Sequence, residues 1–278
     1  MKTPARYEAP DNLVTLLDNV VGSAAQTSFF GSVLSGRSGV ESLDVFASIP
    51  ITPIEMYRRQ RLADLLARPA SVDSIVGPYR GLSPDSVAIT ESSAEGAERF
   101  DIFTDAVQEC LSLETRRTCA VVASADKRYF GAEIATILIR SGVVAHVFVD
   151  HGSPRTYERL RLIKPDILVV LTGHIAEAEL PSSIKLCVTF GLSQRFERVP
   201  QLDLYVVSEL GFLGHSTDGD GYVLYKDSYH FETSEAGRLV VTSLFNRVQP
   251  LLRIETPDHA GPLDGDLVRL RHRGLGMC

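Results

Sequence analysis

The sequence has no long apolar run, no cluster of basic residues and no closely spaced cysteines among its 278 residues. A bilayer requires roughly 20 consecutive apolar residues, and because no stretch approaches that length we expect no contact with a membrane. Lys and Arg are dispersed and the formal net charge is -7, which leaves no basic surface for a nucleic acid backbone. No apolar run follows the charged N-terminus, so we expect a cytoplasmic protein.

Several metal and enzyme motifs are missing as well. The four cysteines lack the paired spacing of structural zinc sites, and none of the seven histidines forms a His-x-x-x-His pair. No Gly-x-Ser-x-Gly turn is present to expose a nucleophilic serine, and no Gly-x-Gly-x-x-Gly turn follows a predicted strand. These gaps disfavour a zinc hydrolase, a serine hydrolase and a dinucleotide-binding enzyme.

Apolar residues make up 44% of the chain, which is enough to bury a large core. The first hundred residues alternate helical stretches with loops, for example at residues 12–25 and 53–67. From residue 118 the pattern changes to four short apolar runs, with helical candidates at residues 129–141 and 154–164 between them. Runs rich in Val, Ile and Leu are typical of buried parallel strands, and they lie at residues 119–124, 143–149, 166–172 and 185–190.

Beyond residue 202 short alternating segments are separated by turn clusters, which indicates antiparallel strands. We therefore predict an α/β fold with a helical N-terminal segment and a βαβ sheet layer over residues 1–201. An antiparallel β-rich subdomain follows over residues 202–278. No repeat or flexible linker separates the two parts, so we predict that residues 1–278 form a single domain.

Three motifs follow one another in the C-terminal third of the chain. They are Tyr205-Val206-Val207-Ser208-Glu209, an apolar strand over residues 237–244, and Arg253-Ile254-Glu255-Thr256-Pro257-Asp258. In order and spacing they resemble motifs of the adenylate-forming superfamily (acyl-CoA synthetases, adenylation domains and luciferases), especially its phenylacetate–CoA ligase branch. The resemblance implies the fold of the large N-terminal domain of these enzymes. It also implies the activation of a carboxylic acid with ATP and Mg2+.

The resemblance implies roles for single residues. Glu209 would bind Mg2+, which prefers oxygen ligands. Ser208 would hydrogen-bond a phosphate oxygen, and Asp258 would accept hydrogen bonds from the ribose hydroxyls. Gly191 would lie against the adenine, because a residue without a side chain permits close approach. Tyr205, which opens the first motif, is assigned to the same nucleotide site.

Residues 90–99 take the place of the phosphate-binding loop of this family. Ser92, Ser93 and Gly96 could still cradle the β- and γ-phosphates. Three glutamates in this stretch would bring negative charge close to the phosphates; they are Glu91, Glu95 and Glu98. At about 4 Å and an effective dielectric near 20, the repulsion between one such carboxylate and a phosphate charge costs roughly 4 kcal/mol before screening. Glutamates that point outward would reduce this repulsion.

The chain departs from the family pattern at other places too. Glu255 and Pro257 replace the arginine and the glycine expected in the ribose motif, and proline removes a backbone donor. The chain ends about where the family continues into a small C-terminal domain, so we expect a truncated homologue without the lysine that this domain supplies. Phe130 and Phe190 are candidates for the wall of a reduced acyl pocket, with core packing as the alternative.

We therefore predict an acyl-activating ligase homologue that uses ATP and Mg2+ to adenylate an aromatic or small carboxylic acid in a biosynthetic pathway. The altered loop and the missing lysine leave two alternatives open. One is a non-catalytic descendant that binds a nucleotide, an acyl ligand or a protein partner. The other is a half-enzyme completed by a separate C-terminal domain or by a second copy, and we count a carrier protein among the candidate partners.

Overall fold

The N-terminal part of the computed structural model consists of short helices. The structure describes residues 8–37, 39–67, 74–76, 88–111, 117–149, 153–173, 175–191, 194–263 and 267–271. The predicted helix at residues 12–25 is confirmed as α1 (Leu13–Ala25). The stretch 53–67 forms two short helices rather than one; the first five helices are α1, α2 (Ser28–Leu34), α3 (Leu43–Ala47), α4 (Ile54–Arg58) and α5 (Leu62–Leu65).

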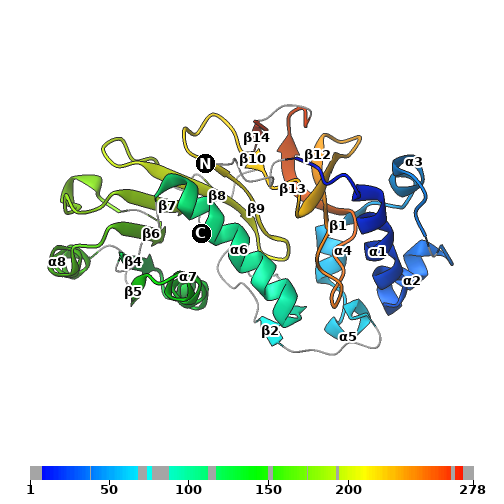
Figure 1. Ribbon diagram of the computed structural model, residues 1–278, viewed down its shortest axis with the longest axis horizontal. Helices are drawn as coiled ribbons and strands as arrows, with labels where there is room; N and C mark the ends of the chain where they lie inside the picture. Colours follow the sequence, from blue (N-terminus) through cyan, green and yellow to red (C-terminus); the bar gives the residue numbers. More distant parts are fainter. Residues whose placement is uncertain are drawn as a thin grey trace.

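The four predicted parallel strands are confirmed and belong to a seven-stranded sheet (Figure 1). The sheet continues through β8, which is also parallel, and ends in two antiparallel strands. Its order is β10 (Val223–Leu224), β9 (Gly211–Ser216), β8 (Gln201–Val207), β7 (Leu186–Phe190), β6 (Ile167–Leu171), β4 (Thr118–Ala123) and β5 (Val144–Val149).

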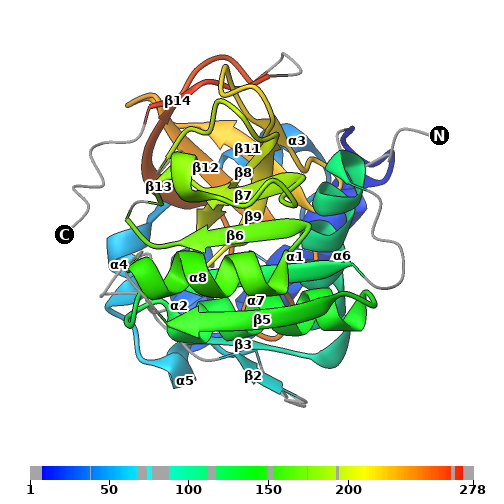
Figure 2. The same cartoon turned by 90° about the vertical axis from the view of Figure 1, so that its left-hand side faces the viewer.

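Helices cover both faces of this sheet, which explains why β4, β6 and β7 are mainly apolar and buried, whereas the prediction of burial was wrong for the edge strand β5, which is partly exposed. Successive side chains of a strand point to opposite faces. Accordingly Val121 of β4 packs in the cluster that includes α7 (Arg128–Arg140), whereas Val122 packs against α8 (Pro154–Ile163). In Figure 1 these two helices lie on opposite sides of β4, and Figure 2 shows α8 on the side turned to the viewer.

A second sheet joins the two ends of the chain. Its strands run in the order β1 (Thr52–Pro53), β13 (Ile254–Ala260), β12 (Arg238–Ser243) and β11 (Tyr229–Thr233), and β14 (Leu270–Arg271) also pairs with β13. The strands from β11 on are antiparallel as predicted, whereas β1 is parallel to β13. Because β8, β9 and β10 belong to the first sheet, the division between the sheets follows β10 rather than residue 202.

A long helix, α6 (Ser93–Cys110), was not predicted. It follows β3 (Ile89–Glu91), which pairs with β2 (Ser74–Val76), and it runs across the seven-stranded sheet (Figure 1). Its Phe103 packs against Phe212 of β9, with ring centroids 5.2 Å apart. The helix occupies the stretch that resembles a phosphate-binding loop in sequence.

Candidate functional site

The candidate site lies where the parallel strands β7 and β8 end. Gly191 follows the last residue of β7, and Ser208 and Glu209 follow the last residue of β8. The two strands are adjacent, and the Gly191 N–H donates to the Leu204 carbonyl of β8 at 3.0 Å. Ligands of open α/β sheets bind at the carboxyl ends of the strands, so these residues have the position that a binding site requires.

Gly191 has the backbone conformation that glycine permits. Its φ is +66°, in the left-handed region where a side chain is strained. A Cβ built there would meet no heavy atom of the described residues within 4 Å. No described side chain therefore covers the position of that Cβ, and the contact with adenine stays a prediction.

Tyr205 fixes the position of Asp258. Its hydroxyl donates to Asp258 Oδ2 at 2.7 Å, which connects β8 to β13. The ring is buried and packs against Tyr222, with centroids 5.5 Å apart. Burial, and then the Asp258 carboxylate, raise the pKa of Tyr205 well above its ordinary value. Tyr205 therefore acts on the site through the carboxylate that it orients, because its ring has no open face.

Ser208 carries a hydroxyl that is buried and has no hydrogen-bond partner among the described residues. A buried polar group without a partner costs about 1–3 kcal/mol relative to a satisfied one. A ligand oxygen at the end of β8 would remove that penalty. Of the predicted site residues, Ser208 is the one whose own geometry points to a ligand.

Glu209 is paired with a residue that the sequence did not indicate. The Arg58 guanidinium donates from Nε to Glu209 Oε1 at 2.8 Å and from Nη2 to Oε2 at 3.0 Å. The Glu209 side chain is 0% exposed and that of Arg58 is 17% exposed. Both carboxylate oxygens therefore face a fixed cation, and the described residues include no group of three or more His, Cys, Asp or Glu side chains suited to a metal. In this arrangement Glu209 does not fit the role of a Mg2+ ligand.

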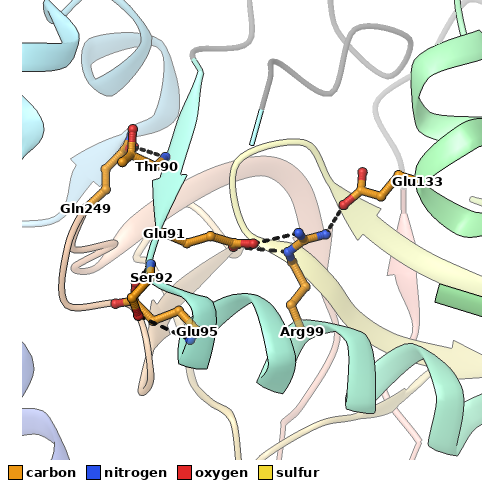
Figure 3. Close-up of polar contacts among 7 residues, drawn as sticks. All are labelled: Thr90, Glu91, Ser92, Glu95, Arg99, Glu133 and Gln249. Carbon is orange, nitrogen blue, oxygen red and sulfur yellow. Dashed lines mark hydrogen bonds and ion pairs between the residues drawn. The ribbon is translucent and has the colours of Figure 1, made fainter. Parts of the chain in front are cut away.

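The start of α6 is closed by a carboxylate of the chain itself (Figure 3). Ser92 caps the helix by accepting from the Glu95 N–H at 3.3 Å, and the Ser92 N–H donates to Glu95 Oε2 at 2.6 Å. Glu95 Oε1 accepts from the backbone N–H groups of Arg247 and Val248. The carboxylate thus occupies three backbone donors of the kind that bind an anion.

Glu91 also points inward rather than outward. Both of its oxygens accept from Arg99, at 3.1 and 2.7 Å, and Arg99 also contacts Glu133 (Figure 3). Gly96 leaves room for this pair, because a Cβ there would lie 2.8 Å from Glu91 Oε1. Ser93 is exposed on the first turn of α6. The roles of Ser92, Ser93 and Gly96 toward phosphates stay predictions, while the contacts just described give Ser92 and Gly96 a structural role.

Comparison with known proteins gives the fold. Neither a family model nor a curated protein matches the sequence. The structure is similar to that of 2-hydroxyisobutyryl-CoA ligase in complex with 2-HIB-AMP and CoA. The TM-score is 0.69 at 17% identity, over 96% of this chain and 68% of that one. The chain has the fold of the adenylate-forming enzymes.

Other enzymes with this fold are less similar. The amide bond synthetase McbA from Marinactinospora thermotolerans matches with a TM-score of 0.51 and 15% identity, over 82% of this chain and 56% of that one. A luciferase-like enzyme from the nonluminescent mealworm Zophobas morio matches with a TM-score of 0.50 and 15% identity, over 73% of this chain and 59% of that one. At these identities the likeness shows the fold alone.

Two aromatic residues proposed for an acyl pocket lie in the core of the adenylate-forming fold. Phe130 and Phe190 are both buried and pack edge to face, with ring centroids 5.3 Å apart. Phe130 also stacks on Phe212. Core packing, the alternative reading of these residues, accounts for both contacts.

Proposed function

We propose that the chain is a homologue of the carboxylate-adenylating ligases that handles a carboxylic acid as its acyl-adenylate. The supporting observation is the buried Ser208 hydroxyl without a described partner, at the end of β8 in an adenylate-forming fold. A ligase with this fold was crystallised with 2-HIB-AMP, an acyl-adenylate. An aromatic or small acid, used in a biosynthetic pathway, remains the proposed substrate.

The proposed roles follow from the positions of the side chains. The Ser208 hydroxyl donates to an oxygen of the α-phosphate. The Asp258 carboxylate, oriented by Tyr205, accepts from the ribose hydroxyls. Gly191 lies against the adenine.

With ATP as the co-substrate, an oxygen of the acid's carboxylate attacks the α-phosphorus. The bond from that phosphorus to the oxygen that bridges it to the β-phosphate breaks, and pyrophosphate leaves. In this step Glu209 stays paired with Arg58 and holds no Mg2+.

Pyrophosphate release tests this proposal. We expect release that depends on an added acid in a panel of aromatic and aliphatic acids. We expect Ser208→Ala to slow it about tenfold to a hundredfold, because a hydrogen bond to a charged group contributes about 1.5–3 kcal/mol. Release that is no faster with any acid than without one would contradict adenylation.

A second candidate, a non-catalytic or partner-dependent descendant, is favoured by one observation. The Glu95 carboxylate occupies the backbone N–H groups of Ser92, Arg247 and Val248, which would otherwise be available to a polyphosphate. Calorimetric titration with AMP, ATP and candidate acids separates the candidates, because binding without turnover supports the second and turnover by the chain alone removes it. Turnover restored by a separate C-terminal domain or a carrier protein would support the partner-dependent form.

A further inference from the structure

The Arg58–Glu209 pair joins two elements that lie far apart in the sequence. Glu209 follows β8, and Arg58 is the last residue of α4, 151 positions earlier in the chain. The pair is bidentate, with donor–acceptor distances of 2.8 and 3.0 Å, and the carboxylate is completely buried. Such a geometry is what a buried ion pair needs in order to offset the desolvation of its charges.

Helix α4 is held in place by the residue next to Arg58. The Tyr57 hydroxyl accepts from Gln249 Nε2 at 3.0 Å, and Gln249 Oε1 accepts from the Thr90 N–H at 2.7 Å. Tyr57 itself is 0% exposed. The guanidinium is therefore part of a built arrangement of side chains and not a mobile surface group.

Ser208, the residue before Glu209, has a buried hydroxyl without a hydrogen-bond partner among the described residues. It lies next in the chain to a carboxylate whose charge Arg58 compensates. The end of β8 thus combines a buried hydroxyl without a described partner and, at the next residue, a carboxylate that an arginine neutralises.

A guanidinium can do part of the work of a divalent cation. It stays charged at every physiological pH, and its planar fork of N–H donors matches the two oxygens of a carboxylate, as it does on Glu209. It differs in charge, because Mg2+ on a carboxylate leaves a net charge of +1 whereas Arg58 on Glu209 leaves zero. A site of this kind suits one phosphate group better than three.

We propose that Arg58 stands in for the divalent cation at this site, so that the chain binds the phosphate of an adenylate without magnesium. The proposal rests on the proposed function in one respect, since it takes an adenylate as the ligand. In this role Arg58 is a positioning residue that holds Glu209 and neutralises its charge, so that a phosphate bound at Ser208 does not meet a bare carboxylate.

Calorimetric titration of AMP into the full chain, in excess EDTA and in excess MgCl2, tests the proposal. We expect the same affinity in both buffers. Arg58→Met should weaken binding in EDTA about tenfold to a hundredfold, because the phosphate then lies near an unpaired Glu209 carboxylate and the like charges repel. Because this substitution leaves Glu209 open to a metal, MgCl2 should restore the affinity of that variant.

Two more variants keep the test informative. The Arg58→Met/Glu209→Gln double variant removes both charges and so protects the fold; because no bare carboxylate is left near the phosphate, it should bind AMP about as the unmodified chain does in both buffers. Arg117→Met is the matched control, because Arg117 pairs with Asp166 at 3.2 Å and its side chain is 18% exposed. Both residues lie at the amino ends of strands of the same sheet, whereas the candidate site lies at the carboxyl ends. AMP affinity should therefore not change.

The outcomes separate the two proposals. If MgCl2 strengthens AMP binding to the unmodified chain, or if Arg58→Met binds AMP in EDTA as the unmodified chain does, the role of Arg58 is wrong while the adenylate site stands. If the double variant binds AMP in EDTA as weakly as Arg58→Met does, the role of Arg58 is also wrong. If AMP binds in neither buffer, the adenylate site and the proposed function fail together.

Discussion

The buried hydroxyl of Tyr205 orients the carboxylate that we assign to the ribose. In Tyr205→Phe the Asp258 carboxylate loses this donor at a buried position, so we expect the free energy of unfolding to fall by about 1–3 kcal/mol. Urea denaturation measures the loss. Tyr129→Phe is the control, because that side chain is 63% exposed and its loss should be close to zero. Equal stability of Tyr205→Phe and the unmodified chain would contradict the structural role of the bond.

His215 gives the stability of the chain a dependence on pH. Burial lowers the pKa of its imidazole from 6.5 to about 4, although Glu109 lies 3.6 Å from Nε2 and Tyr225 lies 3.1 Å from Nδ1. Between pH 6.5 and pH 4 the unfolded chain binds a proton that the folded chain does not. The contribution of the neutral imidazole is therefore complete above pH 6.5 and is lost as the pH falls toward 4.

His215→Gln isolates this effect. The difference in unfolding free energy between the unmodified chain and the variant should shrink by up to roughly 3 kcal/mol as the pH falls from 6.5 to 4. Urea denaturation at a series of pH values measures it. A difference that stays constant over this range would show that the imidazole titrates alike in both states.

At the scale of secondary structure elements, two glycines in helices make opposite predictions. Alanine in place of a helical glycine usually stabilises by about 0.5–1 kcal/mol. Gly22→Ala in α1 should show this gain, because no described atom lies within 4 Å of the new Cβ. Gly96→Ala in α6 should instead lose about 1–2 kcal/mol, because its Cβ would lie 2.8 Å from the Glu91 carboxylate that Arg99 holds. Thermal or urea denaturation of both variants checks the signs, and a gain at Gly96 would contradict the account of the Glu91–Arg99 pair.

The elements that were predicted from the sequence are those with a local signal. The four predicted parallel strands are nearly continuous apolar runs, although β5 lies at the edge of the sheet and is partly exposed rather than buried. The helices α1, α7 and α8 are periodic over two turns or more. Helix α6 was missed because its first turn resembles a phosphate loop. The signal for it was present in Ser92 and Glu95, since a serine followed three residues later by a glutamate forms a capping box.

At the scale of the whole molecule, Arg253 connects the C-terminal part of the chain to its N-terminal part. It donates to the carbonyl oxygens of Ala47 and Ile49 and to both carboxylate oxygens of Glu232. Arg253→Met should lower the unfolding free energy by about 3–5 kcal/mol, the usual effect of breaking a buried ion pair. Arg161→Met is the control, because its pair with Glu179 is about half exposed and should contribute about 0–1 kcal/mol. Urea denaturation compares the two, and similar losses would contradict the role of Arg253.

The position of the candidate site was predictable only in part. Gly191 and Asp258 each hydrogen-bond a residue of β8 and Ser208 follows that strand, and the motifs in the sequence indicated all three. Arg58 could not be inferred, because no local pattern predicts a contact over 151 residues. The inward turn of Glu91 was not predictable either, since it depends on Arg99 and on the space that Gly96 leaves.

The central claim is that an adenylate binds where β7 and β8 end. Crystals of the chain soaked with AMP test it most directly, and a parallel soak with ATP and MgCl2 tests the larger ligand. The account predicts ordered density for AMP with the phosphate at Ser208, the ribose at Asp258 and the adenine over Gly191. No ordered nucleotide, or one bound away from these three residues, would contradict it.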